Sequence, residues 1–266
     1  MPNKTPLVLL PGLLCDAALW WHQVETLSGV ADISVADLTN DDQTGSAARA
    51  VLASAPDEFA LAGLSMGGYV ALEIIRQAPD RVTRLALLDT SAHPDTQEKI
   101  KFRQELINLA RIGQFKGVTR RLLPKLIHPE RIADRALVES IMQMAERVGR
   151  DAFLRQQRLI MNRPDSRHDL ALIYCPTVVI CGRQDGLTPL ADSEEMAEKI
   201  PLAKLVVIED CGHLSTMERP RAVSAVLRYW LQINGETGAG VSCCVQEGDS
   251  ARRRPGVHRP WRDGYR

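Results

Sequence analysis

The chain of 266 residues contains no long hydrophobic run, since no apolar stretch reaches the roughly 18 residues that a membrane-spanning helix requires. It also has no excess charge of either sign, because 33 basic residues balance 33 acidic residues. A neutral chain has no general attraction for nucleic acid or for an anionic membrane, so neither is expected as a partner. Residues 1–6 show neither the basic nor the apolar segment of a signal peptide, which favours a cytoplasmic location.

Cysteine is sparse and irregularly spaced. No two cysteines form a CxxC motif, and none has the Cys/His spacing that is typical of a metal site. A disulfide framework is therefore not expected, and buried reduced thiols are the favoured interpretation. Neither a metal nor another cofactor is predicted. The six cysteines are Cys15, Cys175, Cys181, Cys211, Cys243 and Cys244.

The turn Gly63-Leu64-Ser65-Met66-Gly67, followed by Gly68, matches the G-x-S-x-G pattern of a nucleophile elbow. In such an elbow a serine occupies a strained turn between a strand and a helix, and the glycines make room for it. Residues 59–62 form a short apolar run typical of a buried strand, and residues 69–75 carry apolar side chains at helical spacing. This context favours the elbow over the alternative, a glycine-rich turn whose serine only caps a helix.

Strands and helices alternate on both sides of this turn, which predicts βαβ units and a mostly parallel sheet of about six strands flanked by helices. Asp16 is expected to cap the first helix, which continues to Leu27. The strands are expected at residues 7–10, 33–36, 59–62, 85–88, 177–181 and 205–208, and the other helices at residues 46–55, 69–77, 190–200 and 223–233.

The alternation stops after the fourth expected strand. Residues 92–167 contain helical stretches punctuated by glycine and proline, and no strand pattern, so they predict a helical cap inserted into the core. The core then consists of residues 5–91 and 168–234. Residues 235–266 are rich in glycine and arginine without periodicity, and are predicted to be a disordered tail.

A serine hydroxyl becomes a nucleophile only when a neighbouring base takes its proton and a third group orients that base. Asp185 follows the fifth expected strand, and His213 follows the sixth. Because the carboxyl ends of parallel strands meet at one edge of a sheet, both are expected near Ser65. Asp89, at the end of the fourth strand, is the alternative acid, and His93 is the alternative base.

With these motifs in this order, residues 5–234 resemble the α/β-hydrolase superfamily, and more narrowly its small capped esterases and lactonases. The resemblance implies an oxyanion hole made by two backbone N–H groups, those of Leu13 and Met66. The family usually has His-Gly-x after its first strand, whereas this chain has Pro11-Gly12-Leu13. The leading hairpin of the family is also absent, since six residues precede the first strand.

The resemblance implies a serine hydrolase that cleaves a carboxylic ester or lactone of a small to medium substrate through an acyl-enzyme on Ser65. Leu14, Trp21 and His93 are expected to contact this substrate, the only partner predicted. Several alternatives stay open at this point. A C–C bond hydrolase or a cofactor-free haloperoxidase would use the same three residues, and a binding protein of the same fold would use none of them catalytically.

Overall fold

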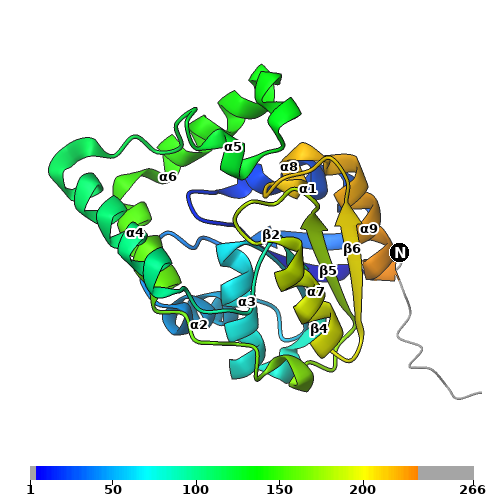
Figure 1. The fold of residues 1–266 in the computed structure, drawn as a ribbon. Coiled ribbons are helices and arrows are strands. Elements are labelled where there is room, and N and C mark those ends of the chain that lie inside the picture. Colours follow the sequence, from blue (N-terminus) through cyan, green and yellow to red (C-terminus); the bar gives the residue numbers. More distant parts are fainter. Residues whose placement is uncertain (1–3, 233–266) are drawn as a thin grey trace, which may run out of the picture. The chain divides into compact units, whose positions relative to one another are not determined.

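The structure, a computed structural model, describes residues 4–232, and the expected tail at 235–266 lies outside the described residues. It contains a six-stranded sheet in which every neighbouring pair of strands is parallel, as predicted (Figure 1). In the order in which they lie side by side, the strands are β2 (Ala31–Val35), β1 (Thr5–Leu10), β3 (Phe59–Leu64), β4 (Val82–Leu88), β5 (Thr177–Gly182) and β6 (Ala203–Ile208).

The central strands are apolar on both faces, because helices cover the sheet on both sides. Successive side chains of a strand point to opposite faces, so Leu7 and Leu9 join one hydrophobic cluster while Val8 and Leu10 join the other. Both clusters are fully buried at these positions or nearly so. This double burial explains why the strands read as continuous apolar runs rather than as alternating ones.

The helices of the core divide between the two faces. The first cluster includes buried side chains from α1 (Trp21–Leu27) and α9 (Pro220–Gln232), which also contact each other. The second includes side chains from α2 (Thr44–Ser54), α3 (Met66–Gln77) and α7 (Leu190–Lys199). One short helix, α8 (Ser215–Glu218), follows β6 after a loop of residues 209–214.

The first helix begins differently from the prediction. The Asp16 carboxylate does cap a helical turn by accepting from the Ala18 N–H, at 2.9 Å, but this turn is a 3₁₀ helix, Ala17–Trp20. The α-helix α1 starts only at Trp21.

Between β4 and β5 the described chain contains helices and no strand, as expected for residues 92–167, called the cap below. Its elements are α4 (Gln97–Leu109), a π-helical turn (Ala110–Gln114), α5 (Leu123–Leu126), a 3₁₀ turn (Pro129–Ala133) and α6 (Arg135–Met161). Gly149 interrupts the helical geometry inside α6 with a φ of 75°, which glycine adopts at little cost. Figure 1 shows α5 beyond the arrowheads of β5 and β6, at the carboxyl edge of the sheet.

Membrane-spanning helices and the state of the cysteines can be described for residues 4–232. Among residues 4–232, no helix is both long and apolar enough to cross a bilayer. The four cysteines in this range, Cys15, Cys175, Cys181 and Cys211, are free thiols.

Candidate active site

Ser65 stands between β3 and α3 with a φ of +54° and a ψ of −116°, a conformation that residues other than glycine rarely adopt. The glycines after it are required by space. A Cβ on Gly67 would lie 2.2 Å from the Leu10 carbonyl oxygen, and a Cβ on Gly68 would lie 2.3 Å from Thr90 Oγ1. Both contacts are far shorter than a van der Waals distance, so only glycine allows α3 to start so close to β1 and β4.

The structure brings the three predicted residues into one hydrogen-bonded chain. Ser65 Oγ lies 2.9 Å from His213 Nε2, and His213 Nδ1 lies 2.8 Å from Asp185 Oδ2. Asp185 and His213 come from the loops after β5 and β6, and both are buried. An ionised carboxylate can only accept, so Nδ1 carries the proton and the Nε2 lone pair faces the serine hydroxyl. This arrangement can remove a proton from Ser65.

The charges of the acid and the base support each other. Burial alone would raise the pKa of Asp185, but the neighbouring His213 and the hydrogen bonds from His213 and Thr188 hold it below its ordinary value. Burial alone would lower the pKa of His213, but the Asp185 carboxylate raises it above its ordinary value. Thr188 Oγ1 donates to Asp185 Oδ2 at 2.7 Å and thereby fixes the carboxylate.

Asp89, the alternative acid, makes a different set of contacts. Its two carboxylate oxygens accept from the backbone N–H groups of Gly182, at 2.9 Å, and Ser215, at 3.1 Å. Burial, together with the nearby Asp185 charge, raises the pKa of Asp89 to about 7. Asp89 therefore ties the ends of β4 and β5 to the start of α8, and the Asp185 carboxylate is the one that contacts the imidazole.

One group of potential metal ligands lies beside these residues. Ligand atoms of Asp89, Cys181 and Asp185 all lie within 4.8 Å of one another. The oxygens already accept hydrogen bonds from the protein, and burial raises the pKa of the Cys181 thiol to about 12, so it stays protonated. The cluster therefore fits a hydrogen-bonding role, and we assign no metal to it.

The two expected oxyanion donors, the N–H groups of Leu13 and Met66, lie in the loop after β1 and at the start of α3. Met66 is the first residue of α3, so its N–H has no partner in a preceding turn. Gly12 brings the loop after β1 against the serine, since a Cβ at this glycine would lie 3.4 Å from Ser65 Cβ. Within residues 4–232 neither the Leu13 nor the Met66 N–H donates to a protein acceptor. Both groups are thus available to a ligand.

A cavity of about 840 Å³ opens at Ser65 and His213. It is lined on the other side by the cap. Leu14 and His93, which were expected to contact the substrate, are also in its wall. Most of its surface is apolar; the apolar cap residues include Phe102, Leu106, Phe153 and Ile160. A cavity of this size suits a small to medium ligand.

The expectation that Trp21 contacts the substrate is wrong. Trp21 does not line the cavity, is 51% exposed, and packs its ring edge-on against His22. Trp20 takes the buried position instead, with an exposure of 0%. Adjacent residues of a helical segment point in different directions, so only one of the two tryptophans can face the core.

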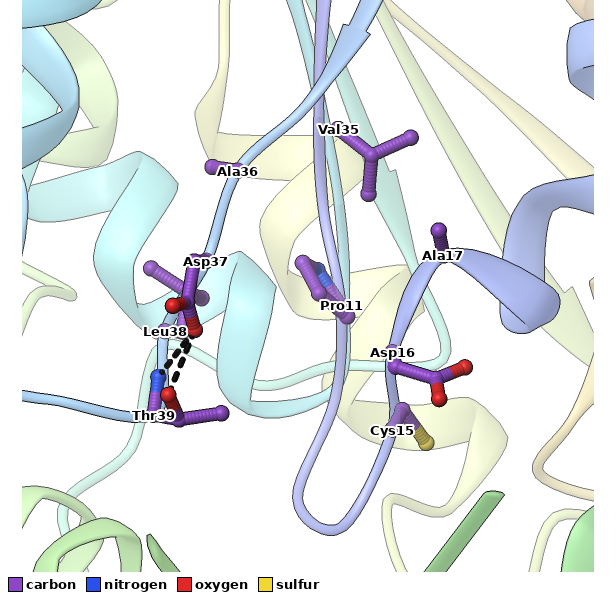
Figure 2. A pocket seen from close by; sticks show the side chains of 9 residues that line it. All are labelled: Pro11, Cys15, Asp16, Ala17, Val35, Ala36, Asp37, Leu38 and Thr39. Atoms are coloured by element: carbon purple, nitrogen blue, oxygen red, sulfur yellow. Dashed lines mark hydrogen bonds between the residues drawn. The ribbon is translucent and has the colours of Figure 1, made fainter. Parts of the chain in front are cut away.

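A second, smaller hollow of about 180 Å³ lies beside the loop after β1 (Figure 2). Figure 2 shows it between Cys15 and Asp16 on one side and the segment Asp37 to Thr39 on the other. Neither Ser65 nor His213 contributes to it. Its Asp37 carboxylate already binds the Thr39 N–H and hydroxyl, at 2.9 and 2.6 Å.

Sequence reasoning missed two polar residues that support the site. Gln156 of α6 is fully buried, and its Oε1 accepts from the Leu14 N–H at 3.0 Å while its Nε2 donates to the Leu38 carbonyl at 3.1 Å. It fixes the loop after β1, where Leu14 has a positive φ of 57°. A glutamine on the apolar face of an amphipathic helix was the only available signal.

The second missed residue is Glu218 of α8, which joins the cap to the loop of the base. Its carboxylate accepts from the backbone N–H groups of His128, at 2.7 Å, and Gly212, at 2.9 Å. The Leu126 carbonyl in the cap accepts in turn from the N–H of His213, at 3.0 Å. The position of the imidazole therefore depends directly on the cap segment around Leu126 and His128.

Comparison with known proteins agrees with this geometry. The sequence model of the alpha/beta hydrolase fold family matches residues 5–220, which is most of the chain. The chain belongs to this family.

Relatives of this α/β-hydrolase include a pimeloyl-acyl-carrier protein methyl ester esterase from Nitrosomonas europaea. The two are 26% identical over 236 residues, which cover 82% of this chain and 92% of the relative. Among solved structures, a thermophilic esterase from Thermogutta terrifontis with malate bound is 28% identical, with a TM-score of 0.77 and coverage of 86% and 90%. An enol-lactonase from Burkholderia xenovorans shares the fold, at 23% identity and a TM-score of 0.78, with coverage of 86% and 92%.

Proposed function

We propose that this α/β-hydrolase is a serine hydrolase that cleaves a carboxylic ester or lactone through an acyl-enzyme on Ser65. The observation that carries the proposal is the hydrogen-bonded chain from Ser65 through His213 to Asp185, whose Ser65 and His213 line a cavity. The conformation of Ser65 supports it as well, because strained backbone of this kind gathers at functional sites.

In the proposed mechanism His213 Nε2 takes the Ser65 proton as Oγ attacks the carbonyl carbon. The negative charge on the carbonyl oxygen is stabilised by the N–H groups of Leu13 and Met66. Collapse of this intermediate breaks the ester C–O bond, and the imidazolium returns the proton to the leaving alcohol. A water molecule, deprotonated by His213, then attacks the acyl-enzyme. As the bond between the acyl carbon and Ser65 Oγ breaks, the imidazolium returns the proton to Oγ and the acid is released, while Asp185 holds the imidazole throughout.

The proposed substrate is of small to medium size. Residues of the cap line the cavity, and its mostly apolar wall suits an acyl or lactone group rather than a polymer. The relatives support the ester class, since one is named as a methyl ester esterase and another as an esterase whose structure contains malate.

A fluorophosphonate probe tests the proposal, because the probe reacts only with an activated serine. We expect stoichiometric labelling that maps to the peptide containing Ser65, and hydrolysis of p-nitrophenyl esters that is fastest for short and medium acyl chains. Absence of both would indicate a protein that only binds its ligand. If long triglycerides were hydrolysed fastest, the proposed small to medium size of the substrate would be wrong. If a substrate with a scissile C–C bond were cleaved faster than any ester, the proposed ester class would be wrong.

The rate should depend on pH through His213. Only the neutral imidazole can accept the Ser65 proton, and the Asp185 carboxylate raises the pKa of His213 above its ordinary value. We therefore expect kcat/KM to fall as the pH falls, with an apparent pKa above the roughly 6.5 of a free histidine. A pH-rate profile with an uncharged ester measures this limb; an apparent pKa well below that value would contradict the pairing.

A further inference from the structure

The charged groups of the cavity are almost all basic. Its wall includes six lysine or arginine side chains but a single carboxylate, that of Asp95. The six are Lys99, Arg103, Lys116, Arg121, Lys125 and Arg163. A concave site lined by one sign of charge attracts a ligand of the opposite sign.

The most buried of these cations form a built cluster. Asp95 Oδ2 lies 2.6 Å from Arg103 Nε, and Asp95 Oδ1 lies 2.9 Å from Arg163 Nη1. The side chains of Asp95 and Arg163 are 1% and 5% exposed. One carboxylate cannot neutralise two guanidinium groups, so the cluster keeps a net charge of one positive unit.

Each guanidinium group is anchored by the protein and still has a donor to spare. Arg163 donates through Nε to the His93 carbonyl, at 2.9 Å, and through Nη1 to the Ile160 carbonyl, at 2.8 Å. Arg103 donates through Nη1 to Gln157 Oε1 at 2.9 Å. In the described part of the chain, the Nη2 atoms of both arginines make no hydrogen bond to a protein acceptor.

Tyr69 adds a third donor next to them. Its ring lies under Arg163, whose guanidinium carbon is 4.1 Å from the ring centroid. Burial raises the pKa of the Tyr69 hydroxyl, so the group stays protonated and can donate. Within residues 4–232 this hydroxyl has no protein partner either, and Tyr69 lines the cavity.

The cluster is close to the nucleophile. The Tyr69 N–H donates to the Ser65 carbonyl oxygen at 3.4 Å, in the first turn after the elbow, and both residues line the same cavity. Arg163, which stacks on the Tyr69 ring, and Arg103 line this cavity too, so a ligand bound at Ser65 shares the cavity with the cluster.

We propose that Arg163, Arg103 and Tyr69 form a subsite for a carboxylate carried by the substrate a few carbon atoms from the scissile ester. The proposal rests on the proposed function and specifies its substrate as a half-ester of a short dicarboxylic acid. The planar fork of a guanidinium group matches a carboxylate, and a single negative charge balances the single net positive charge of the cluster.

The test compares two substrates of the same shape. Monomethyl glutarate carries the carboxylate, and methyl glutaramate carries an uncharged carboxamide in its place. We expect kcat/KM to favour the carboxylate by about tenfold or more, since hydrogen bonds to charged groups are stronger than neutral ones. Equal values for the two esters would overturn the subsite while leaving the proposed function intact. A larger kcat/KM for methyl 4-phosphonobutyrate than for monomethyl glutarate would overturn the choice of carboxylate over phosphonate.

Substitutions of the two arginines test whether they bind the carboxylate of the substrate. Arg103→Met and Arg163→Lys should both reduce the ratio of kcat/KM for monomethyl glutarate to that for methyl glutaramate towards one. The lysine keeps a positive charge beside Asp95, so that folding is preserved. Arg158→Met is the matched control, because Arg158 is exposed on α6, pairs with Asp42 and does not line the cavity. A preference that survives in both arginine variants would show that the cluster is purely structural.

Binding measurements on a variant without the serine nucleophile test the subsite independently of the proposed hydrolysis. With Ser65→Ala protein, calorimetry should show tighter binding of monomethyl glutarate than of methyl glutaramate. This difference would support the subsite even if the wild-type protein hydrolysed neither ester. The lack of hydrolysis would then contradict the proposed function alone. Equal binding would overturn the subsite.

Discussion

Ser65→Ala is expected to lower kcat/KM for a short p-nitrophenyl ester by about a thousandfold or more. The change removes the hydroxyl whose oxygen lies within hydrogen-bond distance of His213 Nε2, at 2.9 Å. Without it the imidazole has no nucleophile to activate, and the oxyanion donors alone supply a small residual rate. The measurement is steady-state hydrolysis of p-nitrophenyl butyrate.

Folding should not change in this variant. The alanine keeps the backbone of the elbow, and among residues 4–232 the Ser65 hydroxyl makes one hydrogen bond, to His213. The melting temperature and circular dichroism are therefore the control. Activity that persists in protein free of wild-type contamination would show that another residue is the nucleophile.

Asp185→Asn should reduce kcat/KM by a similar amount, about a thousandfold or more. An asparagine amide that donates to Nδ1 favours the imidazole tautomer with its proton on Nε2, which cannot accept from Ser65. Removal of the carboxylate also removes the charge that raises the pKa of His213, so the acid limb of the residual activity should move to lower pH.

Asp89→Asn is the matched control at the neighbouring carboxylate. It should affect stability more than rate, because an amide can accept from one of the two N–H groups of Gly182 and Ser215 but not from both. The loss of one buried acceptor costs about 1–3 kcal/mol. If Asp89→Asn lowered the rate a thousandfold while Asp185→Asn stayed active, Asp89, at the end of β4, would be the acid that orients His213.

The elements that were predicted correctly are those whose structure leaves a pattern in a short stretch of sequence. The elbow needs glycine at positions where a Cβ would meet the Leu10 carbonyl or the Thr90 side chain, so its letters are visible in the sequence. The strands were predicted because both of their faces are buried, which makes them short continuous apolar runs.

The features that sequence reasoning missed depend on contacts between distant residues. Gln156 and Leu14 are 142 positions apart, and the pairing of Arg163 with Asp95 joins the two ends of the cap. A helical pattern indicates which face is apolar but not which element will cover it. For the same reason the sequence did not show that Trp21, next to the buried Trp20, points to solvent and away from the cavity.

The bonds around Glu218 have a consequence for how such proteins diversify. The cap segment at Leu126 and His128 is bonded to the same loop that carries His213. An insertion attached in this way is not an independent module that can be deleted, or exchanged for the cap of a relative, without disturbing the loop that carries His213. Recombination between members of the family should therefore preserve function only where the crossover carries this segment and its glutamate together.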